Sequence, residues 1–386
     1  MPIKSPFESS IAKPGHGKVV LTLLPPCNPT LTTLTYKYPL KLLTRTPGFV
    51  PQPSSSLSST CPSQPVHLYL LTYGGGLLPG DHISVSITLD PRTRMVVTTP
   101  QGSTKIFKTE PTASHPSTST NTLTPKLTSG SIPTLSDKSR QTVDVHIGAD
   151  AALCYLPDPA VPYKDSRYEQ VQTFTIDGTG RSSSSSGGSL CILDWVTQGR
   201  TSRGENWDFH LWRGKNEVWT TVPADQDPTS TRASEKPVTK KKLLLRDSLI
   251  LDSEIDPCSN SNSSSGAGST ENLIRSRTHP HGIIGTLILH GPVFERLASF
   301  ILDKFTSLPR IGGRNWSSTS ASEAATDVSP TYDSLVTFTA ARVRGGFVLV
   351  KFGAQDFATA KDWLGGVLRE EGTVGREFGE EALFCL

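Results

Sequence analysis

Three stretches of this chain gather charged and amide side chains in patterns that could form a fixed polar surface or perform acid–base chemistry. The densest is Leu190–Phe209, in which an apolar run is followed by a cluster containing Arg200, Arg203 and Glu205. Because arginine presents a rigid fork of donors to carboxylate and carbonyl oxygens, this cluster predicts a fixed polar surface at the end of a strand. An ion-pair network that only anchors a loop would explain the same residues.

The second stretch, Leu156–Gln170, mixes charged side chains with three prolines. Its polar residues include Asp158, Lys164, Asp165, Arg167 and Gln170. The prolines exclude a helix from the first half and favour an extended segment. Two interpretations stay open. Neighbouring exposed charges could simply pair, which contributes only about 0–1 kcal/mol, or the segment could line a polar groove or channel.

The third stretch, Tyr73–Asp81, contains Gly-Gly-Gly followed by Pro-Gly-Asp. A phosphate-binding loop would need Gly-Lys-Ser/Thr at the start of a helix, whereas the next residues, His82–Leu89, alternate like a strand. The stretch is therefore either a glycine-rich turn between strands or a tight corner that presents Asp81 and His82.

Other candidate sites are weaker. Asp158, Asp165, Asp194 and Glu205 could supply a carboxylate pair for acid–base catalysis, although nothing in their spacing places two of them face to face. His279 and His281 form a His-x-His pair, which we interpret as non-ligating.

Composition narrows the class of protein. Lys and Arg number 38 against 35 Asp and Glu, a balance that excludes nucleic-acid or membrane-surface binding driven by net charge. The 6 cysteines form no Cys-x-x-Cys pair, which argues against a zinc ribbon and fits a reducing compartment. With neither a signal-peptide pattern nor an apolar run of about 20 residues, we expect a soluble, cytoplasmic protein.

Short β-branched runs recur along the chain and predict a mainly β protein. Strands are expected at 18–24, 67–73, 83–89, 94–99, 143–147, 171–176, 190–197, 209–212, 217–222, 243–251, 283–290, 336–344 and 346–352. Helical periodicity appears at 292–308 and 355–371. Ser/Thr/Pro/Gly-rich segments predict disordered surface insertions at 51–64, 109–140, 178–189, 225–240, 258–276 and 317–330 of one domain spanning 1–386.

Five motifs in this order resemble the urease accessory protein D family (UreD, or UreH in some bacteria), and the long insertions resemble a fungal member. The motifs are GGGLLPGD, MVVTTPQGSTKIFK, LPDPAVPYKDSRYEQ, the Gly-Arg…Arg-Gly-Glu segment near residue 200, and KLLLRDSLILD. The resemblance implies a β-solenoid-like core with about two helices. It also implies a scaffold in nickel urease maturation that has no catalytic activity of its own.

The same resemblance implies the partners: apo-urease, a helical accessory protein F and, through F, a nickel-carrying GTPase, accessory protein G. Nickel would cross a polar tunnel in transit, with no tightly bound cofactor. Residues matching the family's patterns are Asp81, Asp158, Lys164, Asp165, Arg167, Gln170, Arg200, Arg203 and Glu205. We expect Asp81, Asp158 and Glu205 to contact Ni²⁺ transiently, with the flanking cations weakening its binding. The alternatives are a β-solenoid hydrolase or lyase with a carboxylate pair and a β-rich interaction module without a metal role.

Overall fold

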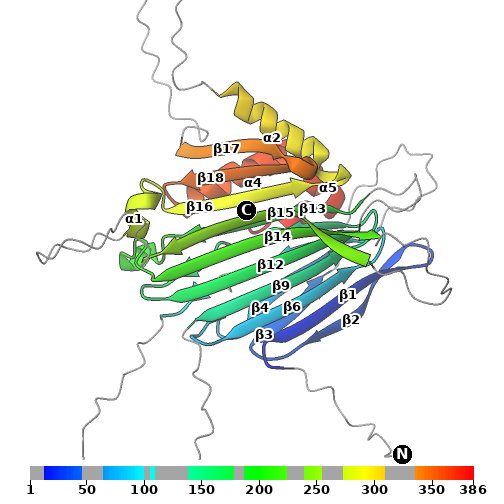
Figure 1. The fold of residues 1–386 in the computed structure, drawn as a ribbon, viewed down its shortest axis with the longest axis horizontal. Coiled ribbons are helices and arrows are strands. Elements are labelled where there is room, and N and C mark those ends of the chain that lie inside the picture. The colour runs from blue at the N-terminus through cyan, green and yellow to red at the C-terminus, as the bar shows by residue number, and fades with distance from the viewer. Residues whose placement is uncertain are drawn as a thin grey trace, which may run out of the picture.

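The structure is a computed structural model that describes residues 13–45, 64–99, 105–108, 138–177, 187–223, 239–253, 273–308 and 335–386. Its described strands form two large sheets and one small one, and helices α2, α4 and α5 lie together at one side of the strands (Figure 1). The prediction of a mainly β protein is confirmed. None of the helices in these ranges is long and apolar enough to span a membrane.

The three sheets have the following strands. The seven-stranded sheet, in spatial order, contains β15 (Thr239–Asp252), β14 (Leu211–Pro223), β12 (Arg167–Asp177), β9 (Ser139–Ile147), β6 (His82–Leu89), β1 (His16–Leu24) and β2 (Asn28–Tyr36). The eight-stranded sheet contains β17 (Val336–Val343), β18 (Phe347–Ala354), β16 (Ile283–His290), β13 (Ser189–Thr197), β10 (Ala152–Tyr155), β7 (Arg94–Thr98), β4 (Val66–Thr72) and β3 (Leu40–Arg45). The small sheet contains β11 (Val161–Pro162), β8 (Lys105–Ile106) and β5 (Gly76–Leu77).

The central part of the chain repeats one path through these sheets. It passes from the eight-stranded sheet to the small sheet and then to the seven-stranded sheet in β4–β5–β6, again in β7–β8–β9, and again in β10–β11–β12. Successive strands within each sheet are parallel along this path, as in β6–β9–β12 and β7–β10–β13. Antiparallel pairs flank it, for example β1–β2 and β14–β15. Each turn of the path therefore encloses space between three sheets.

Two apolar cores explain the strand sequences. The first lies between the large sheets and takes alternate residues of β6, such as Ile83, Val85 and Ile87. The second lies between the other face of the eight-stranded sheet and the helices. Every residue of β13 is buried because that strand has a core on both sides, so its sequence is mostly apolar.

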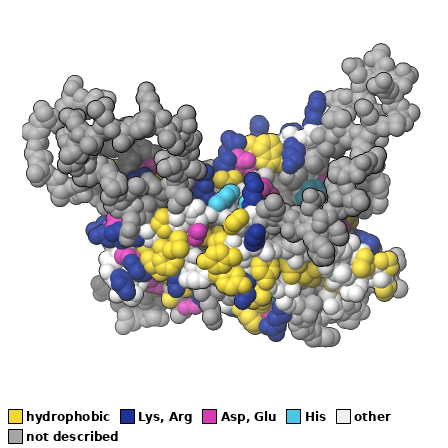
Figure 2. All heavy atoms as spheres, turned by 90° about the horizontal axis from the view of Figure 1, so that it is seen from below, with side chains coloured by type: hydrophobic (Ala, Val, Ile, Leu, Met, Phe, Trp, Pro, Cys, Tyr) yellow, Lys and Arg dark blue, Asp and Glu magenta, His cyan; other side chains and the backbone are white. Residues whose placement is uncertain are grey.

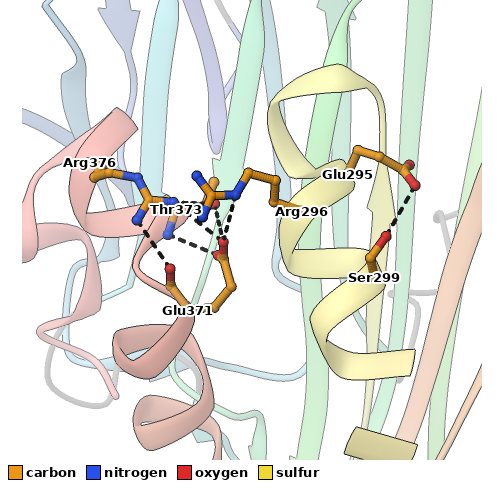
Figure 3. Close-up of polar contacts among 6 residues, drawn as sticks. All are labelled: Glu295, Arg296, Ser299, Glu371, Thr373 and Arg376. Atoms are coloured by element: carbon orange, nitrogen blue, oxygen red, sulfur yellow. Dashed lines mark hydrogen bonds and ion pairs between the residues drawn. The ribbon is translucent and has the colours of Figure 1, made fainter. Parts of the chain in front are cut away.

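The helices that cover this second core are tied together through Glu371. The structure has α1 (Leu273–Thr278), α2 (Glu295–Ser307), α4 (Phe357–Glu371) and α5 (Thr373–Phe378), with short 3₁₀ turns at Thr201–Arg203, Pro292–Phe294, Arg344–Gly346 and Glu380–Leu383. The Glu371 carboxylate accepts from the N–H of Thr373 at 2.9 Å and pairs with Arg376 at 3.3 Å and Arg296 of α2 at 3.8 Å (Figure 3). It thereby joins the end of α4 to both α5 and α2.

Most predicted elements are found, and the differences have local causes. Both predicted helices are present, whereas the short helices α1 and α5 were not predicted. Strands β2, β3 and β10 and the two-residue strands β5, β8 and β11 were missed, and the run at 217–222 and the end of the run at 209–212 belong to the single strand β14. Its Gly214 and Asn216 read as a break, but the pairing of β14 with β12 and β15 carries the strand through them.

The predicted insertions lie almost entirely outside the described residues. Where their margins are described, the prediction was too wide, because Ser139 belongs to β9, Ser189 to β13, Thr239 to β15 and Leu273 to α1. Hydrogen bonding to neighbouring strands brings Ser139, Ser189 and Thr239 into the sheets despite the polar composition around them.

Apolar side chains are exposed near β2, the edge strand of the seven-stranded sheet. Figure 2 views the molecule from the side on which β1, β2 and β3 lie, and it shows apolar side chains gathered there. The exposed residues of these strands and their connections include Leu24, Tyr36, Tyr38 and Leu43.

Candidate site in the space enclosed by the three sheets

Glu205 holds together the polar loop that follows β13. Its carboxylate accepts from the backbone N–H of Arg200 at 2.8 Å and from Arg200 Nε at 3.0 Å, while a terminal guanidinium nitrogen makes a further close contact. Burial favours the neutral acid, but hydrogen bonds from Arg200 and from the N–H of Lys164 outweigh it, so the pKa of Glu205 is lowered. The Arg200 guanidinium also covers the Tyr163 ring at 3.7 Å. The anchoring ion-pair interpretation describes this loop, and Arg203 within it is exposed.

Asp165 occupies the corner before β12. Its backbone has φ +63° and its N–H donates to the carbonyl of Asp208 at 3.0 Å. Its carboxylate lies 3.6 Å from Lys108 Nζ and 3.7 Å from His210 Nε2. Lys164 is exposed, and Arg167 is half-buried at the start of β12. The paired-charge interpretation therefore applies to Asp165.

Asp81 closes its own turn. Its Oδ2 accepts from the N–H of Leu78 at 2.8 Å, and its N–H donates to the carbonyl of Leu78 at 3.0 Å. Gly80 has φ +84°, a conformation that favours glycine. Strand β6 follows directly, so the stretch is a turn between strands, as one of the two interpretations expected.

A small cavity lies in the space enclosed by the three sheets. Its volume of about 30 Å³ has room for one or two water molecules. It is lined by Leu77, Thr99, Ile106, Gln141, Tyr155, Pro157, Asp158, Ala160, Tyr168, Gln170, Asp194 and Trp195. Of the predicted residues, Asp158 and Gln170 line it, whereas Asp81 and Glu205 are not among its lining residues. The structure thus brings one of the three predicted nickel-contacting carboxylates to the cavity.

The second carboxylate of the cavity is Asp194, which the sequence suggested only as one of four possible acid–base residues. It is 8% exposed and accepts hydrogen bonds from Gln170 Nε2 at 3.1 Å and Asn216 Nδ2 at 2.7 Å. Burial raises the pKa of Asp194 to about 6, despite these two hydrogen bonds. The signal in the sequence was an acidic residue within the otherwise apolar strand β13.

The polar wall around Asp194 is incompletely satisfied. The side-chain oxygens Gln172 Oε1 and Asn216 Oδ1 are buried and have no hydrogen-bond partner. Both residues are only 1% exposed. Buried carbonyl oxygens of this kind normally find a partner, so each of these two oxygens could accept a hydrogen bond from a water molecule.

Asp158 forms the other acidic wall and meets the last residues of the chain. Its N–H donates to Thr99 Oγ1 at 2.8 Å. The thiol of Cys385 is hydrogen-bonded to the Asp158 carboxylate, and burial together with that negative charge raises the pKa of Cys385 to about 12. The Cys385 thiol thus lies against this acidic residue of the cavity wall.

No group of three or more His, Cys, Asp or Glu in the described part of the chain is placed to hold a metal ion. His279 is exposed and His281 half-buried, on either side of the cis-proline Pro280. The cavity therefore offers two separated carboxylates rather than a closed coordination shell.

Comparisons with known proteins agree with the sequence motifs. Residues 16–379 match the family described as UreD urease accessory protein. The chain is 30% identical over 298 residues to urease accessory protein 4 of Cryptococcus neoformans var. grubii, covering 74% of this chain and 73% of that protein. It is 26% identical to a urease accessory protein ureD-like protein of Schizosaccharomyces pombe over 86% of this chain and 87% of that one. It is also 30% identical to urease accessory protein D of Arabidopsis thaliana, over 49% of this chain and 50% of the plant protein.

Proposed function

This chain belongs to the UreD family of urease accessory proteins, whose role is in urease maturation, and from that premise we propose a specific task for it. It bridges apo-urease to a helical accessory protein F and, through F, to the nickel-carrying GTPase G, and it conducts Ni²⁺ toward the urease active site. It acts as an assembly factor of one domain in the cytoplasm. The repeated path through three sheets supports a β-solenoid-like body for this task.

The observation that supports conduction is the cavity with acidic residues on two of its walls. Asp158 and Asp194 come from different parts of the chain, and oxygen donors of this kind attract a divalent cation. A conduit must also release its ion, and no group of three or more His, Cys, Asp or Glu in the described residues is placed to hold a metal, so the two carboxylates give attraction without a closed site. We therefore expect weak Ni²⁺ binding in the cavity, without a tight stoichiometric site.

An Ni²⁺ ion entering the cavity would displace a proton from the Asp194 carboxyl instead of meeting a carboxylate that is always ionised. Because the pKa of Asp194 is raised to about 6, its carboxyl ionises just below neutral pH, where Ni²⁺ competes with the proton for it. Asn216, whose Nδ2 donates to this carboxylate, and its register partner Gln172 each carry a buried oxygen without a partner, behind the residues that line the cavity. The cavity is about 30 Å³, so an ion moving through it must shed most of its water.

The test is nickel-dependent activation of apo-urease with accessory proteins F and G. Asp194→Asn and Asp158→Asn should each lower activation by about tenfold or more, the scale of losses for altered metal sites, while co-purification with apo-urease and F is kept. Asp144→Asn, which removes an exposed carboxylate from β9, is the control and should leave activation unchanged. Activation at the parent level in both cavity variants would leave only a docking role.

Asp81 and Glu205 remain predicted contacts of passing Ni²⁺. In the structure both carboxylates are engaged, in a turn and in the Arg200 loop respectively. Asp81→Asn and Glu205→Gln, assayed in the same way, test them one at a time. A loss of activation with assembly retained would support the longer route, and a loss of assembly would assign them to the scaffold.

A further inference from the structure

Two histidines meet on the outer face of the seven-stranded sheet, away from the cavity lining. His16 begins β1 and His82 begins β6, and their ring centroids are 5.9 Å apart at an interplanar angle of 75°. The parallel register pairs His16 with Ser84, so the two histidines are diagonal neighbours on one face. His82 is exposed and His16 half-buried, so water and ions can reach the pair.

The geometry suits two rings that share one metal ion. With metal–nitrogen bonds of about 2.1 Å, each ring centroid lies roughly 3.2 Å from the ion, so two ligating rings stand at most about 6.4 Å apart. The observed 5.9 Å lies within that limit, and a tetrahedral ion would bring the centroids to about 5.2 Å, so the rings must close by roughly 0.7 Å on binding. Each histidine stands on a hydrogen-bonded strand, so the separation is held by the sheet rather than by loops.

Thr142 of β9 holds the His82 ring. His82 Nε2 lies 3.2 Å from Thr142 Oγ1, and when Nε2 donates its proton there, Nδ1 carries the lone pair. Metal-binding histidines commonly use an outer hydrogen bond in this way. Burial, followed by the nearby His16 and Arg140, lowers the pKa of His82.

Arg140 places a positive charge beside the pair, since its register partner on β6 is His82. Its Nε lies 3.4 Å from Glu169 Oε2, so a carboxylate partly offsets that charge. The remaining positive charge repels a metal cation, so we expect the site to bind metal weakly and reversibly.

We propose that His16 and His82 together bind a divalent late transition-metal ion through one imidazole nitrogen each, with water completing the coordination. Imidazole suits Ni²⁺, Cu²⁺ and Zn²⁺. The site stands on the ring geometry alone and is independent of conduction through the cavity.

The test uses the full chain without a polyhistidine tag, titrated with NiCl₂ by calorimetry, with X-ray absorption of the nickel complex to count imidazole ligands. His16→Phe and His82→Phe keep an aromatic ring in each position but remove the ligand nitrogen. Each should weaken Ni²⁺ binding at least about tenfold, and the absorption spectrum should lose its paired imidazoles. Thermal unfolding of each variant shows whether the sheet is intact.

The matched control is a second pair of neighbouring histidines, His279 and His281. A double change, His279→Phe with His281→Phe, should leave the Ni²⁺ affinity within about twofold of the parent, because these rings are not part of the proposed site. Such a change is well below the 1.4 kcal/mol of a tenfold change in affinity. The proposal is overturned if the His16 and His82 variants bind Ni²⁺ like the parent, or if binding is lost only when the His279 and His281 rings are changed. In the first case the edge-to-face contact is aromatic packing alone.

Discussion

Replacing Asp194 with asparagine should stabilise this protein at neutral pH and stabilise it less in acid. Burial raises the pKa of Asp194 from 3.8 to about 6; the negative charge of Asp247 adds to the rise, while Asn216, Gln170 and Lys351 oppose it. The folded protein therefore holds a proton on this carboxyl more tightly than the unfolded chain does. The stabilisation that protonation provides is present below pH 3.8 and is lost as pH rises through about 6.

The magnitude follows from the shift. A rise of about 2 pKa units at 1.36 kcal/mol each makes the ionised carboxylate cost about 3 kcal/mol of folding free energy at pH 7.5. Only about 1 kcal/mol of that cost has appeared at pH 4.5, because most unfolded chains but few folded molecules are then ionised. Asp194→Asn removes the charge, so it should gain about 3 kcal/mol at pH 7.5 and about 1 kcal/mol at pH 4.5.

The hydrogen bonds can adapt to the new amide. The amide nitrogen of Asn at position 194 would face the N–H donor of Gln170 or Asn216. Two donors cannot bond each other, so this contact would reduce the gain in folding free energy. Asn216 Oδ1, however, has no partner, and turning the Asn216 amide presents that oxygen to the new donor. The calculated gain is therefore an upper value that requires this rotation.

The assay is urea unfolding of parent and variant at both pH values, so that titration of all other groups cancels in the difference. Asp144→Asn, the exposed control, should change the free energy of unfolding by less than about 0.5 kcal/mol at either pH. A gain from Asp194→Asn that is equal at pH 7.5 and pH 4.5, or a loss at pH 7.5, would refute the reasoning about a destabilised buried carboxylate.

Three further changes test other parts of the structure. Arg200→Ala should lower the free energy of unfolding by about 2 kcal/mol, measured by urea unfolding, because it leaves the buried Glu205 carboxylate without its charged partner. Gly366→Ala should raise it by about 1 kcal/mol, since Gly366 is exposed within α4 and a Cβ there meets no atom within 4 Å. Iodoacetamide at pH 8 should leave Cys154 and Cys191 unlabelled in the native protein, as judged by peptide mass spectrometry, because both thiols are buried and burial raises the pKa of Cys154.

Each of these three predictions has a control variant or a result that would contradict it. Arg200→Lys should recover only part of the loss, because lysine cannot make the forked contact, so full recovery would contradict the geometric argument. Gly285→Ala should destabilise, in contrast to Gly366→Ala, because its Cβ would lie 2.5 Å from Phe352 Cζ and 2.8 Å from Trp195 Cβ. Rapid labelling of either buried thiol in folded protein would show that the eight-stranded sheet opens there.

Sequence alone determined the features that depend on neighbours along the chain. The alternation of Ile83, Val85 and Ile87 with polar residues specified β6 and its buried face, because side chains alternate across a strand. The turn at Asp81 and the loop closed by Glu205 also use partners within five residues. The same local reading fails for β10, a strand of only four residues that needs its neighbours β7 and β13 to form.

Only the tertiary structure decided which polar residues share an enclosed space. Leu77, Asp158 and Asp194 meet at one cavity because successive turns of the path stack strands that are far apart in sequence. Their register depends on packing between sheets, which no local pattern records. The burial that raises the pKa of Asp194 and the 5.9 Å approach of His16 to His82 arise in the same way. The sequence identified the acidic residues, and the stacking of the sheets determined that Asp158 and Asp194 are the two that line the cavity.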